Sequence, residues 1–160
     1  MPTEPLIIGY YGKVHTHGDF VSRGLPAEFI EPWDTWLQEA IVNSREQLAG
    51  EWLECFLTSP VYRFALAPGI CGGHGWLGIF FPSVDKVGRY YPMTIALRSP
   101  NHLNPFAALQ HESSWLDTVE KLALTVLDND FDLKQFTEKL FDLCPVSIEM
   151  PCPNVEKEQK

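Results

Sequence analysis

The sequence has few basic residues and no long apolar run. Its 12 Lys and Arg residues face 21 Asp and Glu residues, a formal net charge of −9. This charge repels phosphate backbones and anionic lipid surfaces, so we expect no nucleic-acid partner. No window approaches 18 uninterrupted apolar residues, and Met1–Pro5 lacks the basic and apolar regions of a signal peptide. The sequence therefore predicts a cytoplasmic protein without membrane insertion.

The motifs of common catalytic and nucleotide-binding sites are also missing. The sequence contains no GxSxG, no GxxxxGK[ST] and no GxGxxG that opens a helix. Its four cysteines show no CxxC spacing, and a reducing compartment would keep them as thiols. We therefore predict a protein that is not an enzyme and that has no catalytic residue, no metal site and no cofactor.

One group of residues keeps an alternative open. Cys71 and His74 have the Cys-x-x-His spacing of half a zinc site, and the polar segment 12–24 contains His15 and His17. The two histidines are a weak second half, because a loop does not fix their geometry. The alternative is a small-ligand or metal-binding module, or an enzyme, that uses Cys71, His74 and the 12–24 loop.

The composition otherwise fits a folded domain. Hydrophobic residues make up 45% of the 160 residues and charged residues 21%, both near globular averages. We find no internal repeat and no long linker, so we predict a single domain over residues 1–150. The last ten residues, 151–160, are polar and unpatterned and are predicted to form a disordered tail.

Hydrophobic periodicity predicts the elements of this domain. A long helix is expected from Pro26 to Leu48, and its apolar stripe assigns Trp36 to the core. A helix that Asn104 caps and Pro105 opens carries an apolar stripe that reaches Leu127. A further helix should begin near Asp132 and end before Pro145. Short apolar or alternating runs predict strands at residues 6–11, around 19–21, and at 61–67, 76–81 and 90–97.

The order of these elements predicts an α+β fold. The last three strands are joined by connections too short for crossover helices, so they should form an antiparallel meander. The fold class is therefore an antiparallel sheet with a long helix after the first strands and two C-terminal helices. The same element order occurs in the longin or SNARE-like architecture, an analogy that implies no activity.

Charged residues in apolar surroundings are the candidate site. We select two loops, together with one arginine inside a strand: Lys13, Asp19, Phe20, Arg23, Arg63, Ser83, Asp85 and Arg89. Buried ions must pair or form hydrogen bonds, so one interpretation is that these residues pin the loops. The other is that the folded sheet gathers them into one surface for a partner protein. Docking at an exposed sheet edge is a third possibility.

Several sequence blocks resemble one known family. They are GYYGK at 9–13, GDFVSRGLP at 18–26, PWDTWLQ at 32–38, TSPVYRF at 58–64, PG at 68–69 and PSVDKVGRYYP at 82–92. Between Gly9 and Leu97 the sequence is similar to the N-terminal domain of TagF, also called ImpM, an accessory protein of bacterial type VI secretion. His15 and His17 depart from the pattern, which would have a Pro or small residue and a basic residue there.

The resemblance implies a fold and a function. It implies that residues 1–150 form a TagF-like domain of a cytoplasmic protein. It also implies a post-translational repressor of assembly or firing of the secretion apparatus, which acts by binding the forkhead-associated-domain scaffold protein. No catalysis or cofactor is implied.

Overall fold

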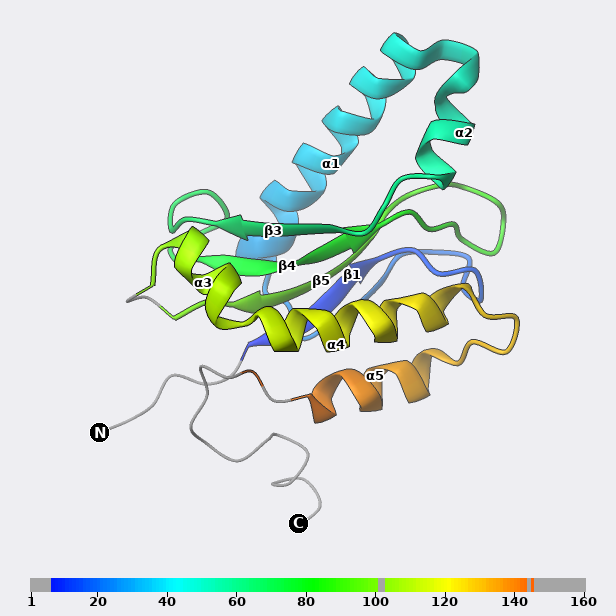
Figure 1. Cartoon of the computed structure of the whole chain (residues 1–160). Helices are drawn as coiled ribbons and strands as arrows, with labels where there is room; N and C mark the ends of the chain where they lie inside the picture. The colour runs from blue at the N-terminus through cyan, green and yellow to red at the C-terminus, as the bar shows by residue number, and fades with distance from the viewer. Residues whose placement is uncertain (1–6, 101–102, 144, 146–160) are drawn as a thin grey trace.

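The strands form one antiparallel sheet. The computed structural model describes residues 7–100, 103–143 and 145, so the predicted tail at 151–160 lies outside the described residues. The five strands have the spatial order β2-β1-β5-β4-β3, and every neighbouring pair is antiparallel. Figure 1 labels β1, β5, β4 and β3 of this sheet. Their bounds are β1 Ile8–Gly12, β2 Val21–Arg23, β3 Tyr62–Leu66, β4 Trp76–Phe81 and β5 Met93–Arg98.

The predicted meander is confirmed. β3 pairs with β4 and β4 pairs with β5, in registers that place Phe64 opposite Gly78 and Ile79 opposite Ile95. β1 then joins the free side of β5, which leaves β2 and β3 as the two edge strands. The α+β class with an antiparallel sheet is therefore what the structure shows.

The N-terminal half of α1 (Ala27–Leu48) lies on one face of the sheet. The helix crosses the sheet obliquely, as Figure 1 shows, and α2 (Trp52–Leu57) follows after a short 3-10 turn. The apolar stripe of α1 buries Phe29, Trp33 and Leu37. Pro32 lies in the second turn and removes one backbone donor, but the helix continues through it to Leu48. Trp36, which the pattern predicted as core, is 49% exposed.

The C-terminal helices lie on the opposite face (Figure 1). They are α3 (Pro105–His111), α4 (Ser113–Leu124) and α5 (Leu133–Asp142). Buried side chains of α4 and α5, such as Leu116, Val119 and Leu140, pack on the sheet in one hydrophobic core. None of the described helices is both long and apolar enough to cross a membrane.

One predicted helix is in fact two. Asn104 caps α3 as expected, since its side chain accepts a hydrogen bond from the Ala107 N–H at 2.8 Å. The chain then leaves helical geometry at Glu112, with φ −102° and ψ 22°, before α4 begins. Periodicity did not show this break, because the apolar spacing stays in phase across it. α4 also ends before Leu127, which is 63% exposed rather than part of the predicted stripe.

Candidate partner-binding surface

Two loops meet at one end of the sheet. The first loop (residues 13–20) follows β1, and the second loop (residues 82–92) connects β4 to β5. Because β5 is antiparallel to both neighbours, the end of β1, the end of β4 and the start of β5 lie together. Gly12 permits the close approach: its φ is 150°, and a Cβ there would lie 2.3 Å from the Pro92 carbonyl oxygen.

Asp85 is at the centre of the contact between the loops. Its side chain is fully buried and accepts a hydrogen bond from the Lys13 ammonium at 3.0 Å and one from Arg89 Nε at 2.8 Å. The backbone N–H groups of Val87 and Arg89 also donate to its carboxylate, each at 2.9 Å. Asp85 therefore closes its own loop and binds the first loop through Lys13.

These contacts determine the charge state of Asp85. Desolvation of the buried carboxylate acts to raise its pKa, but hydrogen bonds from the Arg89 N–H, the Lys13 ammonium and the Val87 N–H lower it more. The net result is an Asp85 pKa well below its ordinary value. The side chain is thus a carboxylate throughout the physiological pH range.

Further hydrogen bonds join the two loops directly. The Lys86 N–H donates to the His17 carbonyl at 2.8 Å, and Arg89 Nη2 donates to the Gly18 carbonyl at 2.6 Å. The Ser83 hydroxyl is buried and donates to the Lys13 carbonyl at 2.5 Å. Lys13, Ser83 and Asp85 thus have contacts that pin the loops, and the loops form one structural unit.

The outward side of this unit presents apolar side chains. Phe20 is 41% exposed and Val87 is 71% exposed. Phe20 is held in place because its ring stacks on Tyr11 at 5.4 Å between centroids, meets Tyr91 edge-on at 4.9 Å and lies under the Lys13 ammonium. Exposed Asp19, Lys86 and Arg89 belong to the same two loops. We call the exposed side chains of Asp19, Phe20, Lys86, Val87 and Arg89 the loop surface.

A third group ties this surface to α1, and the sequence analysis missed it. Asp34 accepts hydrogen bonds from the hydroxyls of Tyr11, at 2.7 Å, and Tyr91. Burial, with the nearby Asp34 carboxylate, raises the pKa of both tyrosines, so their hydroxyls remain donors. The signal that could have indicated this contact is the Asp34 carboxylate between the two tryptophans of the block 32–38.

Two predicted site residues lie elsewhere. Arg63 donates to Asp117 at 2.6 Å and to Glu120, which ties β3 to α4, and the hydrogen bond with Glu120 contributes most to raising the pKa of its guanidinium. Arg23 is exposed on β2, where it lines a hollow beside α5 with Asp132 and Glu138. Arg63 is therefore separated from the loop surface, whereas the hollow that Arg23 lines also includes His17 of the first loop.

The residues of the alternative site are also separated. Cys71 is buried in the aromatic core on the α1 face, and burial raises the pKa of its thiol. His74 contacts Glu28 at 3.3 Å instead. Their segment precedes β4, at the end of the sheet opposite the first loop, by the register of β4, β5 and β1. Among the described residues, no three His, Cys, Asp or Glu side chains converge as metal ligands would.

This chain is similar to a known protein family and to a solved structure. Residues 9–143 match the family described as TagF N-terminal domain, type VI secretion system-associated. The crystal structure of PA0076 from Pseudomonas aeruginosa PAO1 is similar, with a TM-score of 0.81 and 40% sequence identity over 91% of this chain. This chain spans 64% of the length of that protein. No curated protein matches it significantly.

Proposed function

This chain belongs to the TagF N-terminal domain family, which is associated with type VI secretion, and from that premise we propose that it is a non-enzymatic, cytoplasmic accessory protein of that system. It acts after translation as a repressor of assembly or firing. It does so by binding the forkhead-associated-domain scaffold protein of the apparatus through the loop surface. The family match supports the secretion system, and the loop surface supports recognition of a protein.

The observation that carries the proposal is the exposed aromatic ring of Phe20, which stands on two loops that the Asp85 contacts hold together. Interface hot spots are commonly aromatic or arginine side chains at the centre of a surface with a polar rim. Phe20 and Val87 supply such an apolar centre, and Arg89 and Lys86 supply basic residues on the rim. Because the buried Asp85 contacts already hold both loops, binding costs little conformational entropy.

The direct test is calorimetric titration of the purified chain with the purified scaffold protein. Phe20→Ala should weaken binding by roughly tenfold or more, since it removes the apolar centre of the surface. The matched control is Phe106→Ala, which removes an even more exposed aromatic ring. Phe106 lies on α3, on the sheet face opposite α1. Circular dichroism and the thermal midpoint would establish that both variants are folded.

Two outcomes would contradict the proposal. Wild-type affinity in a folded Phe20→Ala variant would place the interface elsewhere, and equal weakening by Phe106→Ala would show that binding is not specific. In a host with a type VI apparatus, overproduction of the wild-type chain should lower secretion, and Phe20→Ala should not. A metal or metabolite retained in a native mass spectrum would favour the ligand-module alternative with Cys71 and His74.

A further inference from the structure

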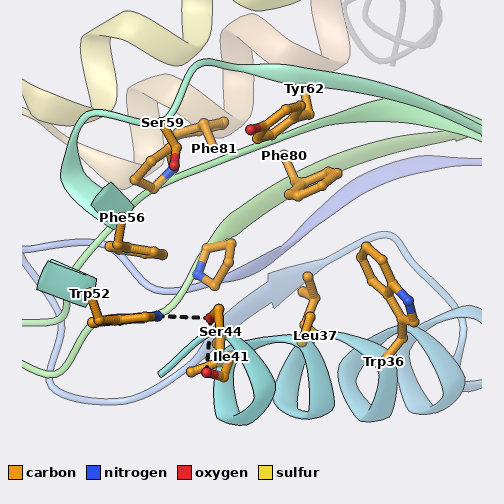
Figure 2. Close-up of a pocket in the computed structure, with 13 residues that line it drawn as sticks. Trp36, Leu37, Ile41, Ser44, Trp52, Phe56, Ser59, Tyr62, Phe80 and Phe81 are labelled. Atoms are coloured by element: carbon orange, nitrogen blue, oxygen red, sulfur yellow. Dashed lines mark hydrogen bonds between the residues drawn. The ribbon is translucent and has the colours of Figure 1, made fainter. Parts of the chain in front are cut away.

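An apolar trough runs between α1 and the edge strand β3. It consists of two hollows that share Trp36 and Phe80. The first, of about 330 Å³, lies between α1, α2 and the end of β4, and Figure 2 shows its lining side chains. The second, of about 470 Å³, continues toward Ile70. Because Trp36 and Tyr62 are 49% and 48% exposed, the trough presents aromatic surface to the outside.

The two serine hydroxyls that line the trough are already used by the protein. Ser44 accepts a hydrogen bond from Trp52 Nε1 at 2.8 Å and donates to the Ile41 carbonyl at 2.9 Å, as Figure 2 shows. The Ser59 hydroxyl donates to the Cys55 carbonyl at 2.7 Å. A polar metabolite would therefore find few convergent partners here, whereas apolar side chains would bury the exposed rings.

The helical arm beside the trough is strongly acidic. Residues 27–57, which form α1 and α2, hold seven Asp and Glu side chains and one basic side chain, Arg45. This arm thus carries six of the nine net negative charges of the chain. Glu39 and Glu46 are exposed and, by helical spacing, lie on the flank of α1 next to Trp36. The charge favours a basic occupant and opposes a second copy of this chain.

The shape of the trough favours a helix. The opposite face of the sheet is covered by α4 and α5, which lie side by side, whereas no helix of the described residues lies beside α1 over β3 (Figure 1). Trp36, Ala40 and Ser44 line the first hollow at intervals of four residues, the ridge that a neighbouring helix packs against. A helix about 10 Å wide would cover Tyr62 and Phe80 from beside α1.

We propose that the trough binds a basic amphipathic helix of a partner protein. The apolar side chains of that helix cover Trp36, Tyr62 and Phe80, and its Lys or Arg residues face the acidic flank of α1. The trough shares no residue with the loop surface. Its test therefore uses different variants, and the two proposals can fail separately.

The test uses a synthetic peptide as the probe. A fluorescein-labelled peptide of about 18 residues, roughly five helical turns, carries Leu on one face and Lys on the other. Its two controls are the same peptide with Glu in place of Lys, and the same composition scrambled so that no apolar face remains. Fluorescence anisotropy would measure the affinity of each peptide for the wild-type chain and its variants at two salt concentrations.

The expected result is specific, salt-sensitive binding of the basic amphipathic peptide. Trp36→Ala and Tyr62→Ala should each weaken it roughly tenfold. Ala40→Phe, which fills the first hollow, should weaken it similarly without removing an aromatic ring. The matched control Phe106→Ala should bind as the wild type does, and the Glu peptide should bind at least about tenfold more weakly.

Several results would overturn the proposal. Unchanged affinity in folded Trp36→Ala and Ala40→Phe would remove the trough as the site, and equal binding of the scrambled peptide would remove the amphipathic helix as the occupant. Self-association of the chain that Trp36→Ala abolishes would assign the trough to a second copy. Hydrogen-exchange protection confined to the β3 backbone, without helix formation in the peptide, would indicate strand addition instead.

Discussion

The two faces of the sheet are covered differently. On one face, α3, α4 and α5 bury a broad core in which Leu116, Val119 and Leu140 are fully inaccessible. On the other face, α1 packs through the aromatic residues Phe29 and Trp33 and leaves Trp36 half-exposed at the edge. Since the apolar face of a sheet must pack against another element, the C-terminal helices close the fold on the first face. The second face combines a compact aromatic core with a surface that remains available for contact.

The sharpest test of this comparison truncates one side chain to alanine on each face of the sheet. Leu116→Ala should lower the free energy of unfolding by about 2 to 5 kcal/mol, because it leaves a cavity in a core that cannot collapse around it. Trp36→Ala should cost less than about 1.5 kcal/mol, because much of the indole is already in water. Urea unfolding followed by circular dichroism would measure both values. Equal losses would mean that the α1 face is as closed as the other.

A second test addresses the end of the sheet, where the two loops meet. Asp85→Asn should destabilise the domain at neutral pH, because it weakens the contacts with Lys13 and Arg89 while both cations stay in place. The folded-state pKa of Asp85 is lowered, so its contribution is complete above the unfolded pKa of about 4 and is lost as the pH falls below it.

The pH dependence separates this charge effect from a packing effect. The stability difference between the wild type and Asp85→Asn should be largest near neutral pH and should shrink as the solution is acidified below about pH 4. Unfolding curves at several pH values would show it. A difference that stays constant down to pH 3 would mean that the negative charge of Asp85 contributes nothing to the contact between the loops.

The smallest effect is expected at the exposed ion pairs of the α4 face. Arg63 bridges Asp117 and Glu120, but its side chain and that of Glu120 are each one-third exposed and that of Asp117 two-thirds. Arg63→Ala should therefore cost no more than about 1 kcal/mol, and added salt should reduce the difference. Thermal unfolding at low and high salt would measure it. A larger, salt-insensitive loss would make Arg63 part of the core that closes this face.

Much of the fold could be predicted because its signals are local. The apolar or alternating strand runs, the stripe of α1 and the cap at Asn104 predicted the elements. The short connections between the last three strands predicted the antiparallel meander. The break at Glu112 escaped prediction, because the apolar spacing stays in phase through it. Trp36 was assigned to the core, since periodicity shows which side of a helix is apolar but not how far a covering sheet extends.

The candidate site could be predicted only in part. The two loops were identified, and the structure joins them. Burial decides which of their residues pin the loops and which form the loop surface. Asp85, Lys13 and Ser83 are buried, whereas Phe20 and Val87 are exposed. Asp34 was missed because its partners Tyr11 and Tyr91 lie 23 and 57 residues away. No local sequence pattern indicates a contact between residues so far apart in the chain.

The amino-acid sequence by itself determined the element types, the family resemblance and the negative charge, since each depends on residue identity and near-neighbour spacing. The tertiary structure alone decided which charged groups are buried, which aromatic rings reach the surface and where a trough opens between α1 and β3. These properties depend on how much water each side chain loses when distant segments pack together, and that quantity exists only once the sheet has formed.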